Sequence, residues 1–297
     1  MKNQNQEQTK VKKRFGDRKD GTLIRDIDAL HFIVPLLYPN RCDNEAYISE
    51  NIDLTNINAW LAKKNAEIDE FPYTMFHVVV AAALKTLTLR PKMNRFIANK
   101  NLYQRNNISA AFVVKKQFND ESEEGLAFIR STPEYTIADV REEIRRQSTL
   151  IRSDKKDSSS ESMDMFNKMP RFISKSIIRF IRFLDTHGKV PASLIESDPY
   201  YASVVLSNLG SIKLKSGYHH LTNWGTNSLF CIIGEKKKSV FFDDDGKAFF
   251  KETVDLGLTV DERIADGYYY SKTVKLLKKL LENPELLESP FNERIDF

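Results

Sequence analysis

The sequence predicts a mixed α/β protein in which helices pack on one face of a mixed β-sheet. Segments with helical periodicity and segments with strand-like alternation are both present along the chain. The expected strands are joined by hairpins as often as by helices, which argues against a doubly wound parallel sheet. The strongest strands lie late in the sequence.

Size and composition exclude several classes of protein. With 297 residues, of which 41% are hydrophobic, the chain can bury a sizeable core. A net charge of +4 does not predict nucleic-acid binding unless the basic residues cluster. The two cysteines have no metal-ligand spacing, so we expect no metal and a reducing, cytoplasmic setting. No apolar run reaches the roughly 18 residues that a membrane span requires.

The expected domain organisation is a flexible basic tail followed by one domain. Residues 1–21 are polar and lack the apolar stretch of a signal peptide. Residues 22–297 form the predicted domain. In its first half we expect strands at 48–54, 107–116 and 126–130, helices at 54–66, 72–90 and 136–150, and a solvated loop at 153–164.

The second half contains the strongest strand signals. We expect helices at 166–184 and 268–282, and strands at 200–206, 228–234, 239–242, 247–250 and 254–260. The segment from Asp243 to Gly246 is typical of a hairpin turn. The strand at 228–234 is almost entirely apolar, which predicts a central position in the sheet.

The end of the last strand carries a charged turn, Thr259-Val260-Asp261-Glu262-Arg263-Ile264-Ala265-Asp266-Gly267. Asp266 lies where a helix begins, and a carboxylate is favoured there by the helix dipole. From spacing alone, a capped turn with surface charges explains this segment as well as a functional site does.

Three segments, in the same order, resemble the catalytic domain of the dihydrolipoamide acyltransferases of 2-oxo acid dehydrogenase complexes. Residues 261–267 resemble the family's D-H-R-x-x-D-G signature and, more distantly, the H-x-x-x-D-G motif of chloramphenicol acetyltransferase. Residues 205–210, V-L-S-N-L-G, resemble its T-I-S-N-L-G strand end. Residues 76–97 resemble its buried helix and the H-P-x-x-N that follows.

The resemblance implies a two-layer α/β sandwich of the chloramphenicol acetyltransferase type and a trimer with its sites between subunits. It implies that Ser207 stabilises an oxyanion, that Asp266 holds the turn, and that Asn208 lies beside the bound coenzyme A, a co-substrate. Arg41 is the candidate partner of Asp266. The expected substrate is an acyl thioester such as acyl-CoA, and we expect no lipoyl domain and no lipoyl group on this chain.

Glu262 stands where the family has its catalytic histidine. An ordinary glutamate, with a pKa of about 4.3, is a weak base for a thiol with a pKa of about 8.5. Burial can strengthen a carboxylate as a base. The sequence therefore leaves three possibilities: an acyltransferase with a retuned base, a different acyl-group chemistry, and an inactive homologue that binds acyl-CoA or acts as a scaffold.

Two further segments carry candidate residues. His219 and His220 are adjacent on an extended segment, so only one can face a given site; they are either part of a packed loop or a displaced general base. Helix 166–184 is strongly amphipathic. It either packs on its own domain, binds a membrane surface, or forms a lid on which Lys175 and Arg179 meet the phosphates of coenzyme A.

Overall fold

The structure is a computed structural model, and it describes residues 14–115, 124–152 and 167–297. Its main sheet has six strands in the order β2-β9-β8-β7-β5-β6. Their bounds are Glu45–Asp53 (β2), Ala248–Asp261 (β9), Leu229–Phe242 (β8), Val204–Asn208 (β7), Ile108–Lys115 (β5) and Glu124–Ser131 (β6). The β5–β7 and β7–β8 pairs are parallel and the others are antiparallel, so the predicted mixed sheet is confirmed.

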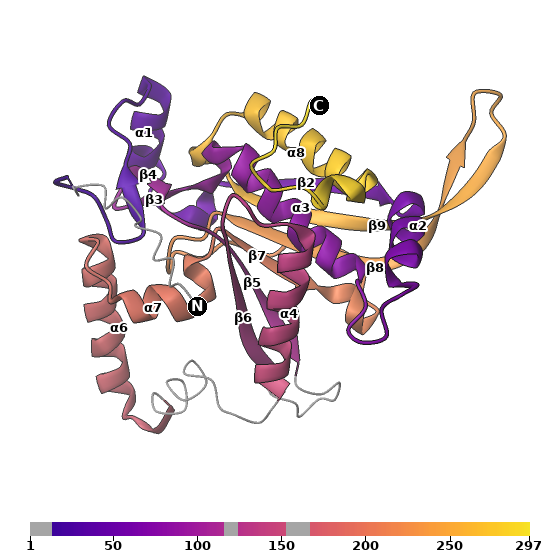
Figure 1. Ribbon diagram of the computed structural model, residues 1–297. Helices are drawn as coiled ribbons and strands as arrows, with labels where there is room; N and C mark the ends of the chain where they lie inside the picture. Colours follow the sequence, from indigo (N-terminus) through magenta and orange to yellow (C-terminus); the bar gives the residue numbers. More distant parts are fainter. Residues whose placement is uncertain (1–13, 116–123, 153–166) are drawn as a thin grey trace, which may run out of the picture.

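Four helices cover one face of this sheet (Figure 1). They are α2 (Thr55–Asn65), α3 (Met75–Leu89), α4 (Ile137–Arg152) and α8 (Gly267–Glu282). Strand alternation sends Leu206 and Cys231 toward these helices, and Val205 and Phe230 into a smaller cluster on the other face. The predicted two-layer arrangement is therefore confirmed.

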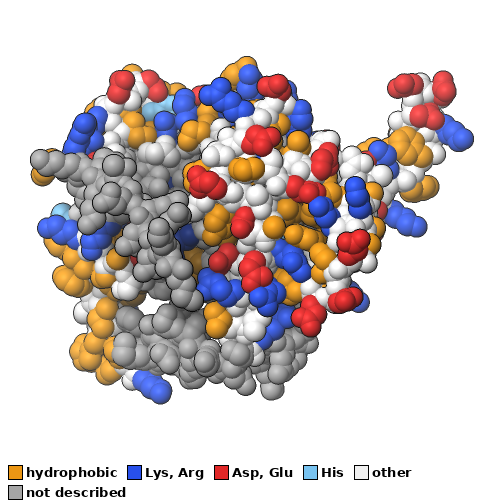
Figure 2. Space-filling view, viewed as in Figure 1, with side chains coloured by type: hydrophobic (Ala, Val, Ile, Leu, Met, Phe, Trp, Pro, Cys, Tyr) orange, Lys and Arg blue, Asp and Glu red, His pale blue; other side chains and the backbone are white. Residues whose placement is uncertain are grey.

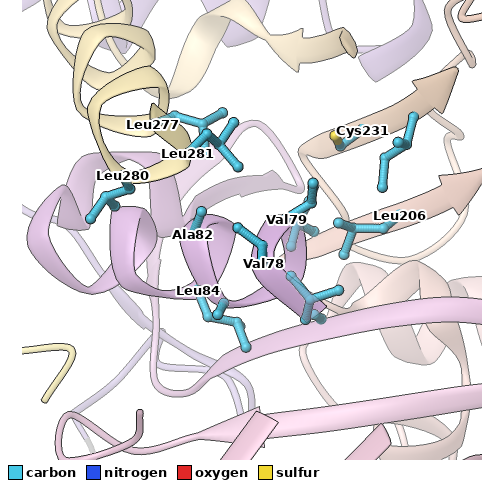
Figure 3. Packing of buried hydrophobic residues seen from close by; sticks show 14 of the residues in the cluster. Val78, Val79, Ala82, Leu84, Leu206, Cys231, Leu277, Leu280 and Leu281 are labelled. Atoms are coloured by element: carbon cyan, nitrogen blue, oxygen red, sulfur yellow. The ribbon is translucent and has the colours of Figure 1, made fainter. Parts of the chain in front are cut away.

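Helix α3 forms the centre of the helical layer, as its apolar sequence predicted. Figure 3 shows Val78, Val79 and Ala82 of α3 packed between α8 and the sheet strands. A capping box between Thr74 and His77 starts the helix, and Pro91 follows its end. Leu84 is fully buried, so truncation to alanine there is expected to cost about 2–5 kcal/mol.

A second, three-stranded sheet was not predicted. It contains β1 (Gly21–Leu23), β4 (Asn101–Arg105) and β3 (Arg95–Ala98), in that order. Helix α1 (Ala29–Leu37), which was not predicted either, lies beside it in Figure 1. The expectation of a flexible tail up to residue 21 is wrong at its C-terminal end, because Arg18 and Asp20 are buried and paired with each other. Residues 1–13 lie outside the described ranges.

Two predicted elements have different bounds. Helix α6 (Arg171–Thr186) begins after Pro170 and not at residue 166, which lies outside the described residues, as does the loop predicted at 153–164. Proline lacks the N–H of a helix interior and therefore suits the position just before this helix. Strand β7 begins at Val204, because Pro199–Tyr201 form a 3₁₀ turn in place of the predicted strand.

The β8–β9 hairpin extends well beyond the sheet and projects from the body of the molecule (Figure 1). The register of the pair shifts between Ile233 and Lys236, which marks a β-bulge. Beyond it, Val240, Phe242 and Phe250 are exposed. Gly246 has a φ of 76° in the predicted turn, a left-handed conformation that glycine adopts without steric cost.

Candidate functional site

The turn after β9 is held by a buried ionic cluster. Asp261 is fully buried and accepts hydrogen bonds from both Nε and Nη2 of Arg263, at 2.8 and 2.7 Å. Arg41 Nε lies 3.6 Å from the same carboxylate. Arg263 also donates to the carbonyl oxygens of Tyr38 and Pro39. The cluster therefore ties the turn to the segment after α1.

Arg41, the candidate partner of Asp266, is instead buried beside Asp261. Burial lowers the pKa of Arg41, and the Asp261 carboxylate opposes that shift. Asp266 instead caps α8, where its Oδ1 accepts a hydrogen bond from the N–H of Tyr269 at 2.9 Å. This hydrogen bond holds the pKa of Asp266 below its usual value, so the capping carboxylate stays charged. Its predicted structural role at the start of the helix is therefore consistent with the geometry.

Glu262 lies between the buried residues Asp261 and Arg263 but is itself exposed. Its backbone N–H donates to the carbonyl of Asn44 at 2.9 Å, which fixes the backbone of the turn. Its carboxylate accepts no hydrogen bond from another described residue. The Asp261–Arg263 pair and this backbone hydrogen bond therefore hold the turn in place, while the Glu262 carboxylate has no hydrogen-bond partner among the described residues.

Ser207 and Asn208 end β7 and line a cavity of about 300 Å³. Phe76, Phe112 and Ile144 supply the apolar part of its wall, and Arg152 contributes a cation. The Ser207 hydroxyl forms no hydrogen bond with a described residue. The Oδ1 atom of Asn208 is buried and has no partner within the described ranges. Both side chains retain hydrogen-bonding capacity toward this cavity.

Within one chain, Ser207 and Glu262 lie far apart. Ser207 pairs with Ile232 on β8, Ile232 pairs with Gly257 on β9, and Glu262 lies five residues further along. At about 3.3 Å per residue and about 4.8 Å per strand, this places them roughly 17 Å apart along the strands and about 10 Å apart across them. The chain alone does not bring the two together.

His219 and His220 belong to a loop that crosses the sheet on the face opposite the helices. His219 stacks on Phe230 with ring centroids 4.2 Å apart, and its Nδ1 lies 2.8 Å from the carbonyl oxygen of His220. A Cβ at Gly257 would lie 1.9 Å from the carbonyl oxygen of Gly217, so this crossing requires glycine. His219 is thus packed, whereas His220 is exposed.

Lys175 and Arg179 lie on α6 and line a separate cavity of about 590 Å³. The described lining residues of this cavity and of the Ser207 cavity do not overlap. The expected packing of this helix on its own domain is also incomplete, because none of its side chains is buried. Within one chain, these two cations are not neighbours of Ser207 or Asn208.

Sequence reasoning missed the roles of three buried groups. Asp261 and Arg263 stand two residues apart at a strand end, a spacing that could have placed them on one side. His77 had no sequence signal, yet its Nδ1 accepts a hydrogen bond from the N–H of Thr74 at 2.9 Å. Burial lowers the pKa of His77 to about 4, so its ring is neutral at pH 7.

Burial also raises the pKa of Cys231 to about 12, which makes it a poor nucleophile. The described residues contain no group of histidine, cysteine and acidic side chains that could hold a metal ion. Among the described helices, none has the length and apolar composition needed to cross a membrane.

Comparison with known proteins shows which fold the chain has and which family model matches part of its sequence. Residues 192–288, about a third of the chain, match the family model of the 2-oxoacid dehydrogenases acyltransferase catalytic domain. This range includes both the Ser207 strand end and the Glu262 turn. A search of curated proteins found no match.

Several solved structures share the fold at low sequence identity. The cubic core of the pyruvate dehydrogenase multienzyme complex matches with a TM-score of 0.58 at 15% identity, over 89% of this chain and 93% of that one. Dihydrolipoamide acetyltransferase from Azotobacter vinelandii gives the same values. Chloramphenicol acetyltransferase matches with a TM-score of 0.55 at 12% identity, over 88% and 99% of the two chains.

The matched family and these solved structures are acyl-transferring enzymes. The chain thus has the chloramphenicol acetyltransferase-like fold that the motifs predicted, and its residues 192–288 match the catalytic-domain family of the 2-oxoacid dehydrogenase acyltransferases.

Proposed function

We propose that this protein transfers an acyl group from a thioester such as acyl-CoA, at a site shared by neighbouring subunits of a homotrimer. The observation that carries the proposal is the placement of Ser207 and Glu262. Both lie in the segment matched by the acyltransferase family, both are at strand ends, and neither side chain has a hydrogen-bond partner among the described residues. Since one chain holds them far apart, a site that uses both needs a second copy.

The two side chains have complementary chemical roles. The carboxylate of Glu262 accepts the proton of an incoming thiol, and the thiolate attacks the thioester carbonyl. Ser207 donates a hydrogen bond to the oxyanion of the tetrahedral intermediate. When the intermediate collapses, the original carbon–sulfur bond breaks, and the departing thiolate takes back the proton from Glu262. One thioester is exchanged for another without net consumption of acid or base.

Dihydrolipoamide acetyltransferase from Azotobacter vinelandii, which shares the fold, supports this assignment. In that enzyme a serine, a histidine and an asparagine have a role in the catalytic mechanism, with the asparagine four positions after the histidine. Here Glu262 and Asp266 have the same spacing, and Asp266 caps α8. We assign Glu262 to the position of that histidine. Desolvation of its carboxylate by a neighbouring subunit would make it a stronger base than an exposed glutamate.

Turnover of acyl-CoA with a thiol acceptor tests the proposal directly. We expect Glu262→Gln to lower turnover about 10²–10⁴-fold, the usual contribution of a positioned base, without changing the assembly. Glu285→Gln, an exposed glutamate outside the site, is the matched control. Light scattering should give about three times the mass of the 34.3 kDa chain.

Two results would redirect the assignment. Full activity of Glu262→Gln, combined with loss of activity in His219→Ala or His220→Ala, would move the base to the loop. A wild-type protein that binds coenzyme A but shows no turnover above background would favour the alternative, an inactive homologue that binds acyl-CoA or acts as a scaffold. Two observations support this alternative: the exposed Glu262 carboxylate has no hydrogen-bond partner among the described residues, and glutamate replaces the motif histidine.

A further inference from the structure

Helix α6 presents aromatic and basic side chains to solvent on the same surface. Phe172, Phe180 and Phe183 are 71%, 60% and 58% exposed. Soluble domains rarely leave such a row of large apolar side chains in water without a partner. In Figure 2, hydrophobic side chains lie along the edge of the molecule where α6 lies in Figure 1.

The helical repeat orders this surface into two adjacent strips. At about 100° per residue, the four cations occupy about 80° of the helix circumference. The three phenylalanines follow within the next 100° or so. The cations are Arg171, Lys175, Arg179 and Arg182. The result is a basic strip bordered directly by an aromatic strip.

Contacts with the body of the protein fix the direction in which this surface points. Ile177, Ile181 and Leu184 form the half-buried side of α6. At its C-terminal end, Arg18 donates to the Asp185 carboxylate at 2.7 Å and to the Asp185 carbonyl oxygen. Arg18 is itself buried and paired with Asp20. The aromatic strip therefore cannot turn inward without breaking these contacts.

The charges on this surface are uncompensated within the described part of the chain. None of the four cations forms an ion pair with another described residue, and they line the cavity of about 590 Å³. The acidic residue of the helix, Asp185, is paired with Arg18. A partner that covers this surface must therefore supply anionic groups next to apolar area.

We propose that α6 binds the surface of a membrane that contains anionic lipids. Phosphate groups of the lipids meet the basic strip, while the phenylalanines enter the boundary between headgroups and acyl chains. This helix has the composition of an interfacial helix, with lysine and arginine on one side and phenylalanine on the other. The proposal concerns attachment and is independent of the acyl-transfer chemistry.

Co-sedimentation of the full chain with vesicles tests the proposal. We expect at least tenfold tighter binding to phosphatidylcholine vesicles containing about 30 mol% phosphatidylserine than to phosphatidylcholine alone, and weaker binding at high salt. Lys175→Glu combined with Arg179→Glu should weaken binding about tenfold or more. The matched control is Lys272→Glu with Lys275→Glu, the same charge change on exposed positions of α8, which should stay within about twofold of wild type.

A second pair of variants tests the aromatic strip. Phe172→Ser with Phe180→Ser should remove the part of the binding that persists at high salt, and both positions are exposed enough to tolerate the change. The proposal is overturned if wild type binds both vesicle types equally or neither, or if the Lys175 and Arg179 reversals bind like wild type. It is also overturned if these reversals dissociate the oligomer in light scattering, which would assign the surface to a second copy of the chain.

Discussion

The turn after β9 and helix α6 are both rich in charge, but they use it in opposite ways. In the turn, Asp261 and Arg263 neutralise each other out of contact with water, whereas Glu262 is exposed and has no ion-pair partner among the described residues. On α6, the cations remain exposed and lack partners among the described residues. A buried ion pair holds the backbone around it in place, whereas exposed charges can bind a ligand or a partner.

The largest expected effect is rescue of activity in mixed oligomers. Ser207→Ala and Glu262→Gln should each lose at least about 100-fold in turnover, since each removes one half of the shared site. Co-expression of the two variants should recover about a quarter of the sites, because random pairing reunites Ser207 of one subunit with Glu262 of another. Turnover of the purified mixture measures this recovery.

The control is a second mixture of two chains. One chain carries Glu262→Gln together with Lys175→Glu and Arg179→Glu, and the other carries Ser207→Ala alone. Recovery should be unchanged, since the α6 surface takes no part in the proposed chemistry. A mixture without recovery would show that the two residues do not meet at a subunit interface.

Removing one member of the buried cluster should strongly destabilise the fold. Arg263→Ala leaves Asp261 buried with only Arg41 at 3.6 Å, and breaking such a pair costs about 3–5 kcal/mol. Arg182→Ala, which removes an exposed arginine of α6, should stay within about 0.5 kcal/mol. Urea unfolding gives both values. Equal losses of unfolding free energy in the two variants would contradict the view that the arginine in the turn is structural and the one on α6 is not.

Stability should fall as the pH drops from 6.5 to 4, because of His77. Its pKa is lowered to about 4 in the folded chain by burial, so the unfolded chain takes up the proton first. The stability is fully present above the unfolded pKa of about 6.5, and about 3 kcal/mol is lost on the way down to pH 4. Unfolding midpoints across this range measure the slope.

His77→Gln should flatten the slope, since glutamine can complete the capping box without titrating. His187→Gln, at the exposed end of α6, serves as the control and should leave the slope unchanged. An unchanged slope in His77→Gln would assign the pH dependence to other groups.

The smallest expected effect concerns the cap of α8. Asp266→Ala removes the acceptor for the N–H of Tyr269 and should cost about 1 kcal/mol, while Asp266→Ser should retain most of the stability. Thermal unfolding measures both. If turnover falls strongly in Asp266→Ala at a temperature at which the variant is fully folded, Asp266 also positions Glu262.

Local signals were sufficient for most of the elements. The alternation of 254–260, the turn before Gly246 and the apolar helix ended by Pro91 each predicted what the structure contains. Helix α1 was missed because ALHFIVPLL has no polar face and contains Pro35, which opposes a helix prediction. The burial of Arg18 was missed because it depends on α6, whose Asp185 is 167 residues away and pairs with Arg18 in addition to Asp20.

In the candidate site, too, features set by the local sequence could be predicted and features set by tertiary contacts could not. Asp266 as a cap could be predicted from its place before a helix, and the structure confirms the capping. The pairing of Arg41 with Asp261 could not, because two buried charges find each other through the fold and not through spacing. The exposure of the phenylalanines on α6 also escaped prediction, since amphipathicity shows that a helix has an apolar face but not what that face contacts.

The bulge in β8 divides one strand into two parts with different neighbours. Residues 229–233 are bonded to β7 or β9 and lie at the centre of the sheet. Residues 237–242 pair with β9 alone, in the projecting part of the hairpin. We therefore expect backbone amides of the first part to exchange with solvent only when the sheet opens, and those of the second part to exchange by local fraying at little free-energy cost. On this basis, a single hairpin is expected to contain both a part of the cooperative folding unit and an end that unfolds independently of it.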